Sequence, residues 1–151
     1  MTPAESTADT IVQEISINAP AARVFDAFAT PAERVKWWRV EGRFETTHME
    51  SDLRPGGRWS MGGRRSDGQP FTVKGEYRVV DRPSALVFTW CPDWQGNTTE
   101  SLVRLDFAEV NGVTRVRLTH SGLVTEPLRA GHRGWPQLLG CLQEHVERQA
   151  H

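Results

Sequence analysis

Hydrophobic and polar positions alternate in short runs through most of the chain between residues 42 and 120. Such alternation is typical of antiparallel strands that have one buried and one solvated face. The clearest run covers 71–79, where alternate positions are predicted to face one way: Phe71, Val73, Gly75, Tyr77 and Val79. The same pattern predicts one shared face in each neighbouring run, formed by Phe44, Thr46 and His48; Trp59 and Met61; Leu86, Phe88 and Trp90; Val103, Leu105 and Phe107; and Val116, Leu118 and His120.

The pattern before this strand-rich region changes twice. Residues 11–17 alternate, with isoleucines on one face, and predict a first strand. Pro20 then favours the start of a short helix, whose apolar face consists of Val24, Phe25 and Phe28. Thr30 is a good N-cap for a second short helix, which we expect to run through Trp38.

The C-terminal segment carries the strongest helical signal. Five apolar side chains repeat at helical spacing and form one stripe: Trp135, Leu138, Leu139, Leu142 and Val146. An amphipathic helix that follows a run of strands must lay its apolar stripe across the sheet. The sequence therefore predicts an α+β fold, in which a curved antiparallel sheet of about six to seven strands wraps around a long C-terminal helix.

The length of 151 residues suits one domain, which would bury roughly 70% of the surface that the unfolded chain exposes. We expect residues 11–150 to form this domain and residues 1–10 to be a flexible leader. The leader has no basic region and no apolar run, and no stretch approaches the roughly 20 apolar residues of a membrane span. We therefore predict a cytoplasmic protein.

Charge and motifs exclude several classes of function. The formal net charge is −1, which gives no electrostatic basis for binding nucleic acid or an anionic membrane. Two cysteines are too few for a disulfide framework or a metal cluster. The patterns G-x-S-x-G and H-E-x-x-H, the P-loop and the Rossmann glycine pattern are all absent. An enzyme with a standard nucleophile or nucleotide is thus disfavoured, and we predict no cofactor.

Seven short motifs follow one another along the domain: 17–28, Trp37-Trp38, 52–59, 75–77, 86–90, 118–122 and Gly134-Trp135. Their order resembles the helix-grip fold of the START and Bet v 1-like (SRPBCC) superfamily, and more narrowly the family of activator of Hsp90 ATPase homologue 1. The resemblance implies a cavity, usually apolar, between the sheet and the long helix. It brings no shared catalytic motif, and fold alone does not fix function.

Candidate ligand-binding residues lie on the inward faces of the strands and on the helix that covers them. They are Trp59, Tyr77, Phe88, Trp90, Leu118, His120, Trp135 and Leu139. These side chains can line a ligand pocket, with Tyr77 and His120 as polar groups that orient the ligand, or they can simply form the core. The two interpretations are compatible in a fold with a cavity.

His120 is also the one weak candidate for catalysis. An inward imidazole at the end of a strand can act as a general acid or base, because its ordinary pKa lies near neutrality. The structural alternative is that His120 satisfies a backbone carbonyl near the loop that follows it.

Two further features have structural as well as functional interpretations. His48 and Glu50 would share a strand face, but a metal site would need His132 or His145 as an additional ligand, and we predict no metal. Trp37-Trp38 ends the second short helix, and we expect one ring to pack inward. If the other ring were exposed, it would be a candidate for a partner or homodimer contact.

Three functional hypotheses follow. The first is non-catalytic binding of a small hydrophobic or amphipathic molecule between the sheet and the C-terminal helix. The second, implied by the family resemblance, is a protein-interaction module that regulates a chaperone ATPase such as Hsp90. The third is a cyclase or hydrolase that uses His120.

Overall fold

A computed structural model shows how the strands and helices are arranged, and it describes residues 10–93, 100–123 and 134–149. Apart from Thr10, the leader predicted at 1–10 lies outside the described residues, and so does the predicted domain end at residue 150. The described elements are β1 (Ile11–Ile17), α1 (Ala21–Ala29), α2 (Pro31–Trp37), β2 (Arg39–Val40), β3 (Phe44–Ser51), β4 (Arg58–Arg65), β5 (Pro70–Asp81), β6 (Ala85–Pro92), β7 (Ser101–Val110), β8 (Val113–Ser121) and α4 (Trp135–Gln149).

The strands form one sheet of eight, in the order β1-β8-β7-β6-β5-β4-β3-β2, and all neighbouring pairs are antiparallel. The predicted α+β helix-grip class is confirmed, with two short helices after the first strand and a long C-terminal helix. The predicted count of six to seven strands is too low. The missing strand is β2, whose two residues are too few to show an alternating pattern.

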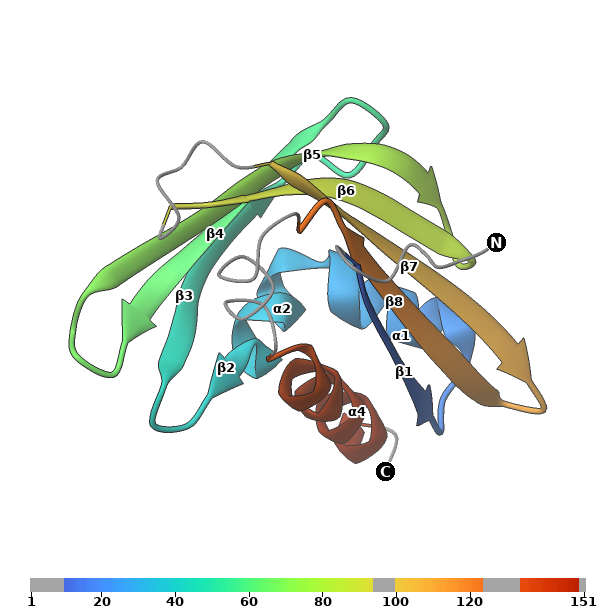
Figure 1. The fold of residues 1–151 in the computed structure, drawn as a ribbon. Helices are drawn as coiled ribbons and strands as arrows, with labels where there is room; N and C mark the ends of the chain where they lie inside the picture. Colours follow the sequence, from blue (N-terminus) through green and yellow to red (C-terminus); the bar gives the residue numbers. More distant parts are fainter. Residues whose placement is uncertain (1–9, 94–99, 124–133, 150–151) are drawn as a thin grey trace.

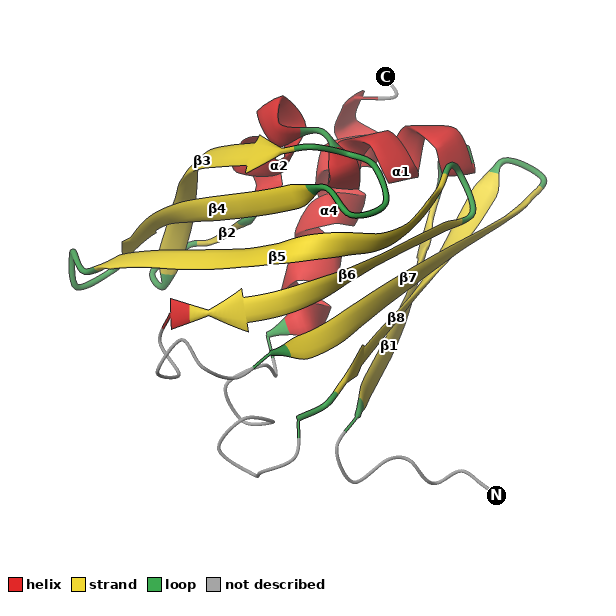
Figure 2. Ribbon diagram, turned by 90° about the horizontal axis from the view of Figure 1, so that it is seen from above, coloured by secondary structure: helices red, strands yellow, loops and turns green. Residues whose placement is uncertain are grey.

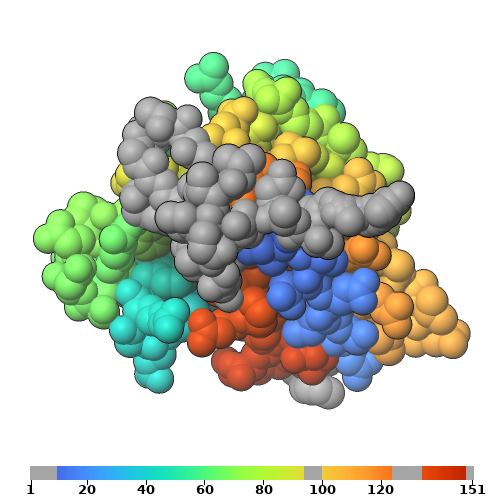
Figure 3. All heavy atoms as spheres, in the orientation of Figure 1, coloured from blue at the N-terminus to red at the C-terminus, as the bar shows by residue number. Residues whose placement is uncertain are grey.

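The sheet arches over the described helices α1, α2 and α4, which lie on its inner side (Figure 1). Seen from above, α4 runs beneath the strands (Figure 2). In the space-filling view, α4 reaches the surface between β1 and the segment of β2 and β3 (Figure 3). None of the described helices is long and apolar enough to cross a membrane.

The apolar stripe of α4 is buried as predicted. Its five side chains are at most 9% exposed: Trp135, Leu138, Leu139, Leu142 and Val146. The predicted apolar face of α1 is confirmed as well, because Val24, Phe25 and Phe28 are fully buried. These side chains belong to one hydrophobic core with the inner face of the sheet.

Two bulges overturn predictions made from simple alternation. The register of β5 against β6 shifts between Tyr77 and Val79, and Val79 is 39% exposed instead of sharing the buried face of Tyr77. The register of β3 against β4 shifts between Thr46 and His48, so Thr46 is buried whereas His48 is exposed. An extra residue in one strand reverses the direction of every later side chain, and the hydrophobic pattern alone does not reveal it.

The start of α1 is stabilised by distant carboxylates. The backbone N–H of Ala21 donates to Glu109 Oε1 at 2.8 Å, and that of Asn18 donates to Glu147 Oε2 at 2.9 Å. Negative charge is favourable at a helix N-terminus. Thr30 occupies the N-cap position of α2 as predicted, but its side chain makes no capping hydrogen bond.

Glu33 connects the three helices. Its Oε2 accepts a hydrogen bond from Arg23 Nη1 of α1 at 2.9 Å, and its Oε1 lies 3.0 Å from His145 Nε2 of α4. Burial raises the pKa of the Glu33 carboxyl, but the bonds from His145 and Arg23 outweigh this, so the pKa falls below its ordinary value of 4.5. The ionised carboxylate therefore stabilises the packing of α1, α2 and α4.

We predict that Glu33→Gln lowers the free energy of unfolding at pH 7 by about 1 kcal/mol, the size of one charge-assisted hydrogen bond that is partly screened by solvent. A folded-state pKa below the unfolded value adds stability that is present above pH 4.5 and is lost as the pH falls through the folded-state pKa. Urea unfolding of the variant should consequently depend less on pH below 5 than that of the wild type.

Glu144→Gln is the matched control. Glu144 pairs only with Arg148 on the solvated side of α4, and both side chains are more than 70% exposed. Its loss should change stability by less than about 0.5 kcal/mol. Equal acid sensitivity of Glu33→Gln and the wild type would contradict the role of Glu33.

Candidate functional site

The structure brings the eight predicted ligand-binding residues into one core, and each of them is at most 3% exposed. Five of their rings form a continuous chain of contacts. The centroid distances are 5.4 Å for Trp59–Phe88, 5.9 Å for Trp59–Trp90, 5.5 Å for Trp90–Trp135 and 5.9 Å for Trp90–His120. We call Trp59, Phe88, Trp90, His120 and Trp135 the aromatic cluster. Their packing against one another accounts for their burial, so their role in binding a ligand stays a prediction.

Trp38 extends the aromatic cluster toward the helices. Its ring lies 6.0 Å from that of Trp90 and 5.5 Å from that of Trp135. Trp37 packs against Phe28, and its Nε1 donates to the carbonyl of Ala27 at 2.9 Å. Both tryptophans are only 3% exposed, so the expected inward packing of one ring is confirmed and the second ring is buried as well. The partner or homodimer contact that depended on an exposed ring loses its basis at this position.

His120 is held by hydrogen bonds at both ring nitrogens. Trp135 Nε1 donates to Nδ1 at 3.0 Å, and Nε2 lies 2.7 Å from Ser101 Oγ. An indole N–H can only donate, so Nδ1 must be the unprotonated nitrogen and Nε2 carries the hydrogen. Ser101 Oγ in turn donates to the carbonyl of Trp90 at 3.4 Å.

This chain of bonds makes His120 a neutral connection between α4, β8, β7 and β6. His120 reaches a backbone carbonyl through Ser101, which is close to the structural alternative considered from the sequence. Acid–base catalysis by His120 would require one of these bonds to break first.

Tyr77 is also partnered within the protein. Its hydroxyl lies 2.6 Å from Ser51 Oγ. Burial raises the pKa of the Tyr77 phenol, and the bond to Ser51 acts in the opposite direction. The phenol is therefore uncharged at neutral pH.

Two other polar atoms on the inner face of the sheet have no hydrogen-bond partner. They are Trp59 Nε1 on β4 and Thr46 Oγ1 on β3, the two fully buried side-chain N or O atoms that lack a partner in the described part of the chain. Buried polar groups are nearly always hydrogen-bonded, so each exception calls for an explanation.

Arg34 is a further buried polar residue, which was not among the candidate site residues predicted from the sequence. It lies on α2, is 2% exposed, and donates from Nε to the carbonyl of Phe28 at 2.6 Å. Burial lowers the pKa of its guanidinium to about 10, and the nearby Tyr77 phenol opposes this decrease. Arg34 thus stays positively charged at neutral pH. Its spacing was a usable signal, because it precedes Trp37 and Trp38 by three and four residues and so shares their helix face.

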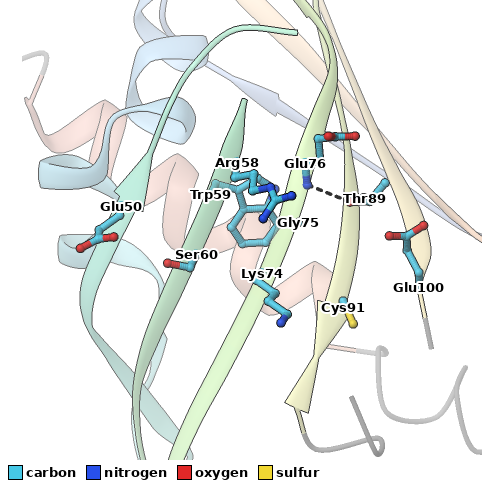
Figure 4. Close-up of a pocket in the computed structure, with 10 residues that line it drawn as sticks. All are labelled: Glu50, Arg58, Trp59, Ser60, Lys74, Gly75, Glu76, Thr89, Cys91 and Glu100. Carbon is cyan, nitrogen blue, oxygen red and sulfur yellow. Dashed lines mark hydrogen bonds between the residues drawn. The ribbon is translucent and has the colours of Figure 1, made fainter. Parts of the chain in front are cut away.

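A separate open hollow of about 490 Å³ lies on the outer face of β4, β5 and β6, with the helices behind the sheet (Figure 4). Its lining is largely charged and polar, and of the predicted ligand-binding residues only Trp59 contributes to it. The regular pairing of β5 with β6 is interrupted beneath this hollow, where the backbone N–H of Glu76 donates to Thr89 Oγ1 at 2.8 Å instead of to a carbonyl. Gly75 has no side chain there, and a Cβ atom would lie 2.8 Å from Trp59 Nε1.

The remaining candidates do not assemble into a metal site within residues 10–93, 100–123 and 134–149, where no three His, Cys, Asp or Glu side chains come together. His48 contacts Thr47 Oγ1 through Nδ1 at 3.1 Å, and His145 contacts Glu33. His132 lies outside the described residues. Cys141 is a free thiol whose Sγ donates to the carbonyl of Arg39 at 3.3 Å.

The curved sheet wrapped on a C-terminal helix defines a helix-grip protein of the START and Bet v 1-like class. The family model of activator of Hsp90 ATPase homolog 1-like proteins matches residues 18–147, and the chain belongs to this family. Comparison with curated proteins gives no match.

Solved structures with the same fold are similar over nearly the whole chain. Protein CV1439 from Chromobacterium violaceum is 26% identical, with a TM-score of 0.82 and coverage of 92% of this chain and 97% of that one. The AHSA1-like protein from Aeromonas hydrophila is 24% identical, with a TM-score of 0.79 and coverage of 93% and 94%. Protein NE0264 from Nitrosomonas europaea is 15% identical, with a TM-score of 0.82 and coverage of 97% and 99%. The last two similarities concern the fold alone.

We predict that His120→Ala destabilises the protein by about 2–4 kcal/mol, because it leaves a cavity, removes the partner of Trp135 Nε1 and leaves Ser101 Oγ with the carbonyl of Trp90 alone. Ser101→Ala leaves the Trp135–His120 bond in place and should cost about 1–2 kcal/mol. Urea unfolding measures both values. If Ser101→Ala were the more damaging change, the bond from Trp135 to His120 would not be the main attachment of α4.

Proposed function

We propose that this protein binds a small hydrophobic or amphipathic molecule in the interior between the sheet and the helices, without chemical conversion. The observation that carries the proposal is the pair of fully buried polar atoms without a hydrogen-bond partner, Trp59 Nε1 and Thr46 Oγ1. Hydrophobic burial against the aromatic cluster would supply most of the affinity, at about 25 cal/mol per Å² before the costs of association.

The proposal changes the predicted roles of individual residues. Tyr77 and His120 already bond to Ser51, Ser101 and Trp135. We therefore assign the orienting role to the unpartnered Trp59 Nε1, which can donate to an oxygen of the ligand. Phe88, Trp90, Trp135, Leu118 and Leu139 remain the proposed apolar walls.

The two alternatives have weaker support. A cyclase or hydrolase would need His120 to give up a bond that fixes α4, as described above. Regulation of a chaperone ATPase rests on the family name, and the buried Trp37 and Trp38 offer no docking aromatic. A binding titration with Hsp90 from the same cell tests the regulation of a chaperone ATPase directly, because such a regulator must form a complex with its target.

The first experiment is native mass spectrometry of protein purified from its own host, followed by denaturing extraction. We expect a small molecule that co-purifies reproducibly with the folded protein and is released on unfolding. Bare protein, together with no thermal shift across a panel of lipids and aromatic acids, would contradict the proposal and favour a filled core.

Two matched substitutions separate binding from packing. Trp59→Phe and Trp37→Phe both shorten a buried ring and lose a similar amount of packing. Trp59→Phe removes an N–H that has no partner, so it should add no further loss of stability but weaken binding of an extracted ligand about 5-fold. Trp37→Phe removes an N–H that bonds to Ala27, so it should cost about 1 kcal/mol more stability than Trp59→Phe and leave binding unchanged. Thermal unfolding and isothermal titration calorimetry measure the two effects, and the opposite pattern would contradict the role of Trp59.

A further inference from the structure

Arg34 is a buried cation without a carboxylate partner. Its side chain enters the core from α2 and is 2% exposed, and no Asp or Glu of the described residues forms an ion pair with it. A buried charge is costly unless it is paired and hydrogen-bonded, and arginine is almost never fully buried without a partner. The interactions that hold Arg34 therefore need to be accounted for one by one.

Part of the charge is compensated locally. Nε donates to the carbonyl of Phe28 near the C-terminal end of α1, where the helix dipole favours a cation. The guanidinium carbon lies 4.1 Å from the ring centroid of Phe28 and 4.9 Å from that of Trp38, both within the range of cation–π attraction. These contacts engage one N–H group and the faces of the guanidinium.

The outer edge of the guanidinium is left without a strong acceptor. Nη1 contacts only the thioether sulfur of Met61, at 3.5 Å, and a thioether is a weak acceptor. Nη2 has no hydrogen-bond partner in the described parts of the chain. Two N–H groups side by side on a guanidinium match the two oxygens of a carboxylate.

The other unpartnered atoms lie on the same part of the sheet. Met61 stands on the inner face of β4 between Trp59 and Gly63, and Gly63 pairs with Thr46 of β3. Inward residues along one strand follow each other at steps of roughly 7 Å. The Met61 contact thus places the guanidinium between the positions of Thr46 and Trp59, whose buried polar atoms also lack partners.

We propose that Arg34 binds the carboxylate of an amphipathic ligand, whose apolar remainder packs against the aromatic cluster. This inference rests on the proposed function and specifies the chemical class of its ligand, a hydrophobic carboxylic acid in its ionised form. The carboxylate would displace the weak Met61 contact and pair with Nη1 and Nη2. Trp59 Nε1 would donate to an oxygen of the same ligand.

The test compares two probes of equal shape, 2-naphthoate and the neutral 2-naphthamide, by isothermal titration calorimetry on the full chain. The wild type should bind 2-naphthoate at least 10-fold more tightly than 2-naphthamide. Arg34→Met should lose this preference while still binding 2-naphthamide. Arg148→Met, which removes one positive charge from a side chain that is 72% exposed, should keep the preference.

A measurement on the wild-type protein keeps the inference testable if Arg34→Met fails to fold. The side-chain Nε–H resonance of Arg34, assigned by comparison with Arg34→Lys, should shift on addition of 2-naphthoate and stay unchanged with 2-naphthamide. If both probes bind and shift this resonance equally or not at all, Arg34 serves only to hold the end of α1.

The outcomes also separate this inference from the proposed function. Equal affinity for the two probes in the wild type and in Arg34→Met overturns the assignment of Arg34 but leaves the interior as a binding site. Binding of neither probe at millimolar concentration contradicts the carboxylate assignment and the aromatic interior as a binding site together.

Discussion

The attachment of α4 to the sheet is the constraint on which the rest of the structure depends. The helix buries its whole apolar stripe, but hydrophobic contact is non-directional and does not fix where along the sheet the helix begins. The hydrogen bond from Trp135 Nε1 to His120 fixes where the helix begins. Ser101 continues this chain of hydrogen bonds from His120 of β8 to Trp90 of β6. The same bonds hold two rings of the aromatic cluster, those of Trp135 and His120, in place, so the architecture and the candidate site share one set of interactions.

Buried polar groups have hydrogen-bond partners in one part of the interior and lack them in another. Around His120, every ring nitrogen and hydroxyl described above has a partner, and the polar groups there stabilise the fold. Beneath β3 and β4, a cation, an indole N–H and a threonine hydroxyl meet apolar surroundings. Polar groups left in this state reduce stability, and such local costs are typical of sites that are completed by a ligand.

The sequence predicted most of the fold because the burial of β1, β7 and β8 follows a regular period of two and that of α4 follows a helical period. It failed at Val79 and His48, where a bulge changes the period without changing composition. Site residues were harder to predict for a different reason. Tyr77 and His120 can orient a ligand only if their polar atoms are not already hydrogen-bonded within the protein. Their partners Ser51, Ser101 and Trp135 are remote in the chain, and the alternation of apolar and polar residues contains no information about such hydrogen bonds.

The pairing of β1 with β8 has a consequence for how the chain folds as it is synthesised. Strands β3 to β7 each neighbour the next strand in sequence, so that part of the sheet can assemble progressively as the chain emerges. Ile11 pairs with His120, however, and β1 stays without its partner strand until β8 has been synthesised. Non-local pairing of this kind slows folding and leaves an open hydrophobic strand exposed in the meantime. Within this sheet, β1 is therefore the first strand to be made and among the last to be paired.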